Sequence, residues 1–283
     1  MTGTSHAKSG GVCQDAHQIE LLPCGRAVAA VADGVGSAKH SDVAAKLAVE
    51  TLVAALRESL TKDSCAEDIK RYIASGYAAA EQAVEAEAER NGDSITEYDT
   101  TLSAVVYGGK GLVYGHSGDG GIVGLTCDGE YVPVTTPQKA ADGICVVPLR
   151  AGASSWVIDS CESDFASVLL ATDGIYDLLF PYLLKGRKTR VYVPFIRYFM
   201  DNEILAATPK NIQSVKAARE AFLSGEALAG VTDDKTVAVI VNSSVLPRRR
   251  ESGYYAEPDW AALQEEWNRK AYPHLYSDPR EGE

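Results

Sequence analysis

The chain has 283 residues, of which 46% are hydrophobic, and a formal net charge of −12 at pH 7. A chain of this length can bury a large core, most simply in one domain with appendages. The acidic balance argues against a nucleic-acid-binding surface, because such a surface needs clustered Lys and Arg. The N-terminal residues lack the apolar core of a signal peptide, and no segment is apolar enough to span a bilayer. We therefore expect a cytoplasmic location and no membrane or nucleic-acid partner.

The first third of the chain predicts one buried strand followed by two helices. The apolar run Ala27–Ala32 predicts the strand, which ends at the turn Asp33-Gly34. Ser41-Asp42 predicts the N-cap of the first helix. The second helix is expected over residues 66–90, where apolar residues recur at helical spacing until Asn91-Gly92 ends it.

The middle of the chain changes to strand patterns. Residues 101–107 and 112–116 predict a hairpin, and residues 178–230 are mostly helical in pattern. Further strands are expected at residues 121–125, 167–171 and 235–241. Strands framed by helices, without strict strand–helix alternation, predict an α+β architecture with sheets inside and helices outside.

The six cysteines are scattered along the chain and form no CxxC pair, so neither a zinc cluster nor a disulfide framework is indicated. Most of them lie in or beside apolar stretches, and we expect buried, reduced thiols.

Four aspartates each follow an apolar run at the point where it breaks into a glycine turn or a polar loop. They are Asp33, Asp119, Asp173 and Asp233. A rigid sheet can bring carboxylates at its strand ends to one point that water still reaches. Hard divalent cations such as Mg²⁺ and Mn²⁺ prefer oxygen ligands of this kind. A single Asp-Gly would indicate only a turn, but four such positions predict a metal site.

Five motifs, in this order along residues 4–241, resemble those of the protein phosphatase 2C family, the metal-dependent serine/threonine phosphatases. They are Gln14-Asp15-Ala16-His17, Asp33-Gly34-Val35-Gly36, Ser117-Gly118-Asp119, Ala171-Thr172-Asp173-Gly174-Ile175-Tyr176-Asp177 and Thr232-Asp233-Asp234-Lys235-Thr236. The resemblance implies a four-layer α-β-β-α sandwich with two central antiparallel sheets and a metal site at one edge. It is strongest to the bacterial branch of the family.

The resemblance also implies the catalytic residues. Asp33 resembles the carboxylate that bridges two metal ions, and the carbonyl of Gly34 faces one of them. Asp173 and Asp233 resemble ligands of the first ion, and with Asp33 they form the expected catalytic set.

Three further aspartates match weaker positions of the pattern. The resemblance places Asp15 either behind the metal ligands or near the second ion, and Asp119 and Asp177 match the weaker ligands of a third. The implied cofactors are therefore two or three Mn²⁺ or Mg²⁺ ions. Two ions that share a water lower its pKa from about 16 toward 7 and stabilise the attacking and leaving oxygens.

The sequence departs from the family pattern at three positions. Many relatives carry Glu where this chain has Gln14, so the second ion loses a charged ligand. A histidine that some eukaryotic relatives use is Val35 here, and the phosphate-binding arginine is replaced by Gly10. Lys8 is the nearest cation and could bind the substrate phosphate as a point charge. Otherwise it is a solvated surface residue.

Several of these residues also have structural readings. Asp177 could cap a helix that starts at Leu178, and Thr100-Thr101 is expected to serve strand propensity and packing. The histidines near the motifs are expected to be structural or solvated rather than catalytic. They are His17, His40 and His116.

Residues 1–244 are expected to form the catalytic domain, and residues 245–283 a polar extension with a short amphipathic helix. Asp259 can cap this helix, and Trp260, Leu263 and Trp267 form an apolar stripe. The stripe can fold back on the domain or dock a partner.

The predicted function is hydrolysis of phosphoserine and phosphothreonine in proteins, opposing a cognate serine/threonine kinase. A haloacid-dehalogenase-type phosphatase is disfavoured, because its nucleophilic Asp needs a second Asp two residues on and position 35 is Val. The alternative from another class is a catalytically impaired phosphatase-fold module that binds phosphoproteins or partners. Retention of Asp33, Asp173 and Asp233 argues against it, because clustered carboxylates are costly to keep in a scaffold.

Overall fold

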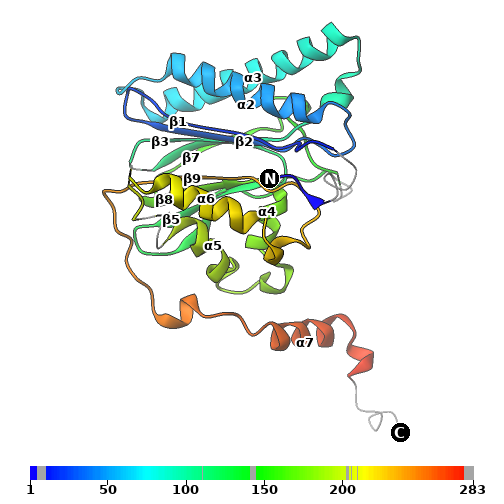
Figure 1. Cartoon of the computed structure of the whole chain (residues 1–283), viewed down its shortest axis with the longest axis vertical. Helices are drawn as coiled ribbons and strands as arrows, with labels where there is room; N and C mark the ends of the chain where they lie inside the picture. The colour runs from blue at the N-terminus through cyan, green and yellow to red at the C-terminus, as the bar shows by residue number, and fades with distance from the viewer. Residues whose placement is uncertain are drawn as a thin grey trace.

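Two antiparallel sheets stack face to face in the computed structural model (Figure 1), which describes residues 1–4, 11–109, 111–140, 145–201, 204, 206–208 and 210–276. The first sheet has the strand order β1 (Ala16–Leu21), β2 (Ala27–Ala32), β3 (Leu102–Tyr107), β4 (Leu112–Ser117) and β7 (Val157–Cys161). The second has the order β6 (Tyr131–Pro133), β5 (Gly121–Thr126), β8 (Phe165–Ala171) and β9 (Val237–Val241). The strand pairs in both sheets are antiparallel.

Helices cover the outer face of each sheet. The helices on the first sheet are α2 (Ser41–Ser59) and α3 (Ala66–Asn91), and those on the second are α4 (Asp173–Leu179), α5 (Val193–Met200) and α6 (Ile212–Leu223). Short 3₁₀ turns lie between these elements: η1 (Ile95–Tyr98), η2 (Leu149–Ala151), η3 (Tyr182–Leu184) and η4 (Glu226–Leu228). This helix–sheet–sheet–helix order confirms the expected α+β sandwich.

Strand β2 is apolar throughout because both of its faces are buried. Side chains alternate across a strand, so Val28 and Ala30 pack under the helices, whereas Ala29 and Val31 pack between the two sheets. The strand therefore lies in the centre of the first sheet with a fixed register, in which Ala29 is opposite Val105 of β3. Its C-terminal end carries Asp33 to one edge of the sandwich.

Small residues let α2 and α3 approach each other closely. At Gly76, a Cβ atom would lie 2.5 Å from Cδ1 of Leu52, a fully buried residue of α2. Helix α3 ends where predicted, at Gly92, which has a left-handed φ of 71° that favours glycine. The predicted N-cap of α2 was wrong. The helix starts at Ser41, and its N-cap residue His40 makes no side-chain capping hydrogen bond.

Two sequence expectations about other parts of the fold were also wrong or incomplete. None of the six cysteine side chains is buried, and Cys65 and Cys145 are exposed. Apolar neighbours did not predict burial because several of these thiols lie at strand ends and in turns, as Cys161 does at the end of the edge strand β7. Strands β1, β6 and β7 were not predicted. Among the described helices, none combines the length and apolar character that crossing a membrane requires.

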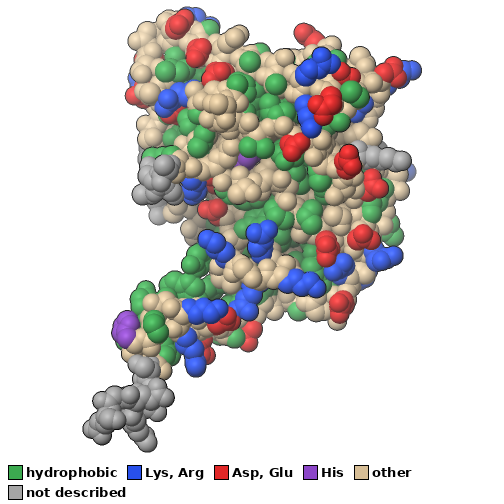
Figure 2. Space-filling model, turned by 180° about the vertical axis from the view of Figure 1, so that it is seen from behind, with side chains coloured by type: hydrophobic (Ala, Val, Ile, Leu, Met, Phe, Trp, Pro, Cys, Tyr) green, Lys and Arg blue, Asp and Glu red, His purple; other side chains and the backbone are tan. Residues whose placement is uncertain are grey.

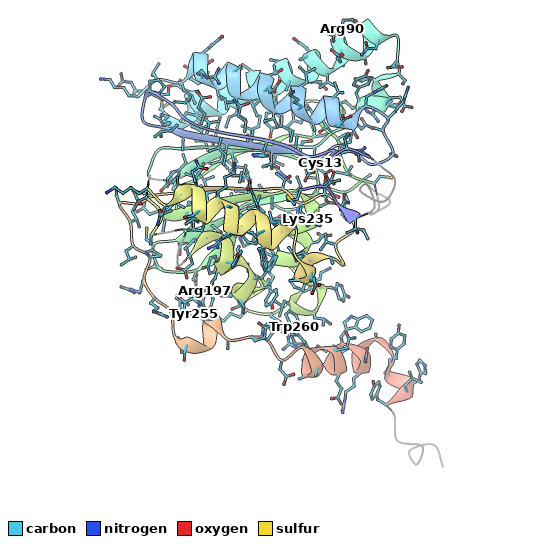
Figure 3. All side chains as sticks on the ribbon, in the orientation of Figure 1. Cys13, Arg90, Arg197, Lys235, Tyr255 and Trp260 are labelled. Atoms are coloured by element: carbon cyan, nitrogen blue, oxygen red, sulfur yellow. The ribbon has the colours of Figure 1, made fainter. Side chains whose placement is uncertain are left out.

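The chain beyond β9 runs along the second sheet and then leaves the body (Figure 3). Its first turn, η5 (Ser252–Tyr255), docks on the body, where the Arg197 guanidinium lies 4.4 Å from the Tyr255 ring centroid. Helix α7 (Trp260–Ala271) follows, capped by the Asp259 side chain as predicted, and then η6 (Pro273–Leu275). Helix α7 has no buried residue, and it meets the body at its edge, where Trp260 packs against Tyr192 with ring centroids 5.1 Å apart.

Candidate active site

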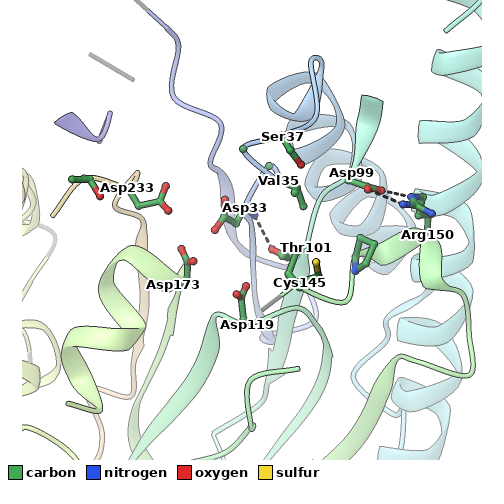
Figure 4. Close-up of a pocket in the computed structure, with 15 residues that line it drawn as sticks. Asp33, Val35, Ser37, Asp99, Thr101, Asp119, Cys145, Arg150, Asp173 and Asp233 are labelled. Carbon is green, nitrogen blue, oxygen red and sulfur yellow. Dashed lines mark hydrogen bonds and ion pairs between the residues drawn. The ribbon is translucent and has the colours of Figure 1, made fainter. Parts of the chain in front are cut away.

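A pocket of about 520 Å³ opens at the edge of the sandwich where the loops of the two sheets meet (Figure 4). Four of its lining residues are the aspartates that follow apolar runs in the sequence: Asp33, Asp119, Asp173 and Asp233. Their side chains point toward one another across the opening. Gly34 and Val35 also line the pocket. The structure therefore places in one pocket the aspartates that the sequence analysis grouped, although Asp33 and Asp233 lie 200 positions apart along the chain.

The remaining predicted residues lie at the border of this pocket or outside the described chain. The charge of Asp15 acts on Asp33, and the charge of Asp177 acts on Asp119, so both are close neighbours of the lining carboxylates. Lys8 and Gly10 lie outside the described residues.

Three hydrogen bonds fix the backbone of Asp33. Its N–H donates to Thr101 Oγ1 at 2.9 Å, and its carbonyl accepts from Thr101 N–H at 2.8 Å and from Thr100 Oγ1 at 3.0 Å. The two threonines thus orient the central carboxylate, a role beyond the strand propensity and packing that we expected of them. The sequence signal was a pair of hydroxyl side chains just before a strand.

Packing requires glycine at position 34, because there is no room for a Cβ atom. A ligand that approaches the backbone carbonyl closely would favour glycine there as well. A Cβ atom at this position would lie 2.7 Å from Cβ of Ser41, the first residue of α2. The Gly34 N–H donates to the carbonyl of Gln14 at 3.1 Å, which ties the Asp33 turn to the chain before β1.

Asp173 is the first residue of α4, directly after β8, and Asp119 lies between β4 and β5. The helical segment that begins at Asp173 already contains Asp177, so the alternative in which Asp177 caps a helix starting at Leu178 is wrong. Position 177 is one helical turn from position 173, which puts both carboxylates on the same side of α4.

The sequence analysis missed the role of Asp234. Its side chain is 1% exposed and accepts two backbone hydrogen bonds of 2.6 Å, from the N–H groups of Gly3 and Gln14. Asp234 therefore anchors the N-terminal segment beside Asp233. A second long-range bond, from Thr172 Oγ1 to Asp15 Oδ2 at 2.9 Å, connects Asp15 to the end of β8.

Burial and mutual repulsion raise the pKa values of the site carboxyls. Burial raises the pKa of Asp33 well above its usual range, and the charges of Asp15, Asp173 and Asp233 raise it further. Burial raises the pKa of Asp15 to about 7, against the hydrogen bond from Thr172. The pKa of Asp119 is raised to about 6, first by burial and then by Asp173. Groups with such raised pKa values in one cleft are typical of functional sites.

Two cations lie at or beside the pocket: Arg150, which lines it, and Lys139, which neighbours Asp119. Lys139 lies with its Nζ 3.9 Å from Asp119 Oδ2. Arg150 lines the pocket and donates two hydrogen bonds to the Asp99 carboxylate, and Val35 N–H donates to the Asp99 carbonyl at 2.9 Å.

No histidine lines the pocket in the described chain. His116 is buried against Ser103, with its pKa lowered to about 4 by burial, which fits the structural role that we expected.

The donor set fits a hard divalent cation in chemical type. Carboxylate oxygens are the preferred ligands of Mg²⁺ and suit Mn²⁺, and Asp173 Oδ1 and Gln14 Oε1 are buried without a hydrogen-bond partner in the protein. A buried acceptor of this kind is costly unless something satisfies it. Within the described ranges, no three His, Cys, Asp or Glu side chains already enclose a common point as a ligand group. Closing a ligand shell therefore requires the carboxylates to approach one another, which their repulsion opposes unless a cation shares them.

A family model for protein phosphatase 2C matches residues 2–211. The chain therefore belongs to the protein phosphatase 2C family. A sequence comparison with curated proteins finds no match.

Solved structures of bacterial phosphatases share the fold at low identity. A bacterial serine phosphatase has 13% identity and a TM-score of 0.60, over 89% of this chain and 97% of that one. The Mycobacterium tuberculosis serine/threonine phosphatase PstP/Ppp has 21% identity and a TM-score of 0.55, over 84% and 93%. The catalytic domain of PstP in complex with two manganese ions has 19% identity and a TM-score of 0.50, over 80% and 95%.

Proposed function

We propose that this chain hydrolyses phosphoserine and phosphothreonine in proteins in a reaction that depends on Mn²⁺ or Mg²⁺. The observation that supports this most is the convergence of Asp33, Asp119, Asp173 and Asp233 on one pocket. A phosphomonoester dianion is repelled by carboxylates, so a pocket of this charge binds it only together with cations. The manganese ions in the related PstP structure support the same choice of metal. A cognate serine/threonine kinase would supply the substrates, and a cytoplasmic location stays a prediction.

Each acidic residue has a proposed role. Three carboxylates and one backbone carbonyl would hold the first two ions: Asp33, Asp173, Asp233 and Gly34. Three more carboxylates would complete the second position and a third: Asp15, Asp119 and Asp177. Bound ions supply positive charge to the phosphate and lower the pKa of a bound water toward neutrality.

The chain's own residues orient this site. Thr100 and Thr101 fix the backbone of Asp33, and a fixed backbone keeps the carboxylate aimed at the reacting group. Arg150 has guanidinium N–H groups beyond those that Asp99 accepts, and they can donate to the substrate. A phosphate contact of Lys8 stays a prediction.

The test is turnover of p-nitrophenyl phosphate and of a phosphothreonine peptide by the EDTA-treated chain, with and without Mn²⁺. We expect no turnover in EDTA, full recovery with Mn²⁺, and no effect of inhibitors of the calcineurin-like phosphatases. Full activity of the metal-free protein would overturn the proposal.

A second candidate is a catalytically impaired module that binds phosphoproteins. Two observations favour it: the neutral Gln14 replaces a charged ligand, and the described carboxylates do not form a closed ligand group. Tight binding of the phosphothreonine peptide with no turnover at saturating Mn²⁺ would support this candidate.

A further inference from the structure

A second, larger groove of about 680 Å³ is lined in part by Asp177 of α4, the helix that also carries Asp173 of the acidic pocket. Its walls come from the segment after β6, from α4 and from η3. Most of its lining is apolar or aromatic: Pro133, Val134, Pro137, Tyr176, Phe180, Pro181 and Tyr182. Grooves of this size and character commonly bind ligands or peptide segments.

The aromatic wall of the groove is fixed on one side and open on the other. The rings of Tyr176 and Phe180 pack with centroids 4.7 Å apart, and the Tyr176 hydroxyl donates to the carbonyl of Thr135 at 3.3 Å. Tyr182 is 63% exposed, although its ring meets Trp267 of α7 edge-on with centroids 6.1 Å apart and has Lys185 Nζ 5.8 Å from its centroid. An exposed tyrosine beside a fixed aromatic wall presents apolar surface to a ligand with little loss of conformational entropy.

The open end of the groove is positively charged. Lys185 and Arg190 line it, and the segment 185–190 contains four cations, Lys185, Arg187, Lys188 and Arg190, and no acid. Arg187 pairs with Glu266 of α7, but neither Lys185 nor Arg190 makes an ion pair in the described part of the chain. Figure 2 shows a face of the molecule on which Lys and Arg side chains gather over the lower half of the body and beside the tail. Cations without an ion-pair partner at the end of a groove complement an acidic ligand.

The groove lies next to the candidate active site at α4. Asp173 lines the acidic pocket, and Asp177, one helical turn further along α4, lines the groove, so the two cavities meet at this helix. A polypeptide whose phosphorylated residue enters the acidic pocket can therefore lay its neighbouring residues along the groove.

We infer that the groove binds an acidic and apolar segment that flanks the phosphorylated residue of the protein substrate. This inference rests on the proposed function and names the substrate class. The apolar side chains of the segment pack on Tyr176, Phe180 and Tyr182, and its carboxylates pair with Lys185 and Arg190.

The test compares phosphothreonine peptides of equal length that differ in one flank. That flank contains Glu and Leu, Gln and Ser, or Lys and Ser. Each composition is placed before the phosphothreonine in one peptide and after it in another. We expect kcat/KM for the Glu/Leu peptide to exceed that for the Lys/Ser peptide by about tenfold, since each exposed ion pair contributes modestly. The double variant Lys185→Glu, Arg190→Glu should abolish or invert this preference. Tyr182→Ser should reduce kcat/KM for the Glu/Leu peptide but not for the Gln/Ser peptide.

The matched control is Lys46→Glu, Lys62→Glu, which makes the same change in net charge on α2 and just beyond it, in the opposite helical layer. This control should keep the wild-type flank preference. p-Nitrophenyl phosphate has no flanks, so its turnover reports the acidic pocket alone. Normal turnover of that compound with equal kcat/KM for all the peptides would overturn the inference and leave the proposed function standing. No turnover of any substrate with Mn²⁺ would overturn both. Binding of phosphatidylserine vesicles that the double reversal abolishes, without any flank preference, would assign the groove to a membrane surface instead.

Discussion

The α2–α3 layer and the acidic pocket contribute to the free energy of unfolding with opposite signs. The helical layer packs apolar side chains against the first sheet with few polar atoms. Four residues of α2 are fully buried there: Ala44, Ala48, Leu52 and Leu56. The pocket gathers carboxyls whose pKa values are raised by burial and by one another. One region therefore stabilises the fold, whereas the other destabilises it in the absence of a cation. Packing alone would favour apolar residues in the pocket, so its acidic side chains are explained by the metal-dependent activity that we propose.

Replacing the central carboxylate should separate the two regions most strongly. We expect Asp33→Asn to lower kcat/KM for p-nitrophenyl phosphate by about three orders of magnitude, about 4 kcal/mol of transition-state stabilisation. The same change should leave the melting temperature of the metal-free protein equal or higher, because it removes a buried charge. Both are measured on one preparation, by steady-state kinetics with Mn²⁺ and by calorimetry in EDTA.

Asp63→Asn is the control for this variant, because Asp63 is exposed and remote from the pocket. It should change neither quantity. Near-normal turnover of Asp33→Asn with unchanged Mn²⁺ stoichiometry would show that Asp33 is not a metal ligand.

A change in the helical layer should have the opposite profile. We expect Leu52→Ala to lower the free energy of unfolding by about 3 kcal/mol through lost burial and a cavity. Turnover per folded molecule should stay within twofold of wild type, because Leu52 does not line the pocket. Urea unfolding and kinetics at low temperature measure the two effects.

Gly76 offers a matched test of the same contact. In the wild type, Gly76→Ala should destabilise by about 1–3 kcal/mol, because the new methyl group would overlap Leu52 Cδ1. In the Leu52→Ala background the overlap is absent, and the same substitution should stabilise by about 1 kcal/mol through helix propensity. An equal effect in both backgrounds would mean that the two helices do not pack as described.

The pKa shifts predict how the metal-free protein responds to pH. The carboxyls of Asp15 and Asp119 have pKa values raised to about 7 and about 6, above those of the unfolded chain. Between about pH 4 and 7 the folded state therefore binds more protons than the unfolded state, so these groups lose their contribution as pH rises. His116 acts in the opposite direction, because its pKa is lowered to about 4 and the unfolded state binds the extra proton.

The variant Asp15→Asn isolates one of these contributions. We expect wild type to lose about 1–3 kcal/mol of stability relative to Asp15→Asn between pH 5 and 8 in EDTA. Saturating Mn²⁺ should remove the difference in slope. Parallel curves in EDTA would mean that Asp15 does not titrate in this range.

The parts of the molecule that could be predicted from the sequence are those that depend on neighbouring residues. The apolar run of β2 predicted that this strand is buried, and Gly92 predicted where α3 ends. Both predictions rest on local properties, hydrophobic periodicity and the left-handed conformation of glycine. The four aspartates were grouped in one pocket from the sequence, and three of them, Asp33, Asp119 and Asp173, follow the strands β2, β4 and β8, whose ends the apolar runs predict. Asp233 instead lies in the loop before β9.

The missed features depend on contacts between distant residues. Asp234 accepts hydrogen bonds from Gly3 and Gln14, more than 200 positions away, and nothing near Asp234 in the sequence indicates them. The threonine pair that orients Asp33 is separated from it by more than 60 positions. The start of α4 at Asp173 was missed for another reason: Asp-Gly is a turn signal as well as a helix start.

Gln14 provides the smallest expected effect and the sharpest test of how far the site extends. Its N–H donates to the side chain of Asp234. Its Oε1 is buried without a hydrogen-bond partner in the protein, and it lies 3.9 Å from where a Cβ atom would be on Gly36, a residue that lines the pocket. A neutral amide offers a dipole where a carboxylate offers a full charge. We therefore expect Gln14→Glu to lower the Mn²⁺ concentration that gives half-maximal activity by about tenfold, about 1.4 kcal/mol. In EDTA the same variant should be less stable than wild type, because it adds a carboxylate next to Asp15.

Gln14→Leu, which removes the polar oxygen at similar volume, should weaken Mn²⁺ binding or leave it unchanged but should not strengthen it. Superimposable Mn²⁺ titrations of wild type and Gln14→Glu, measured by calorimetry as well as by turnover, would mean that position 14 lies beyond the reach of the ion.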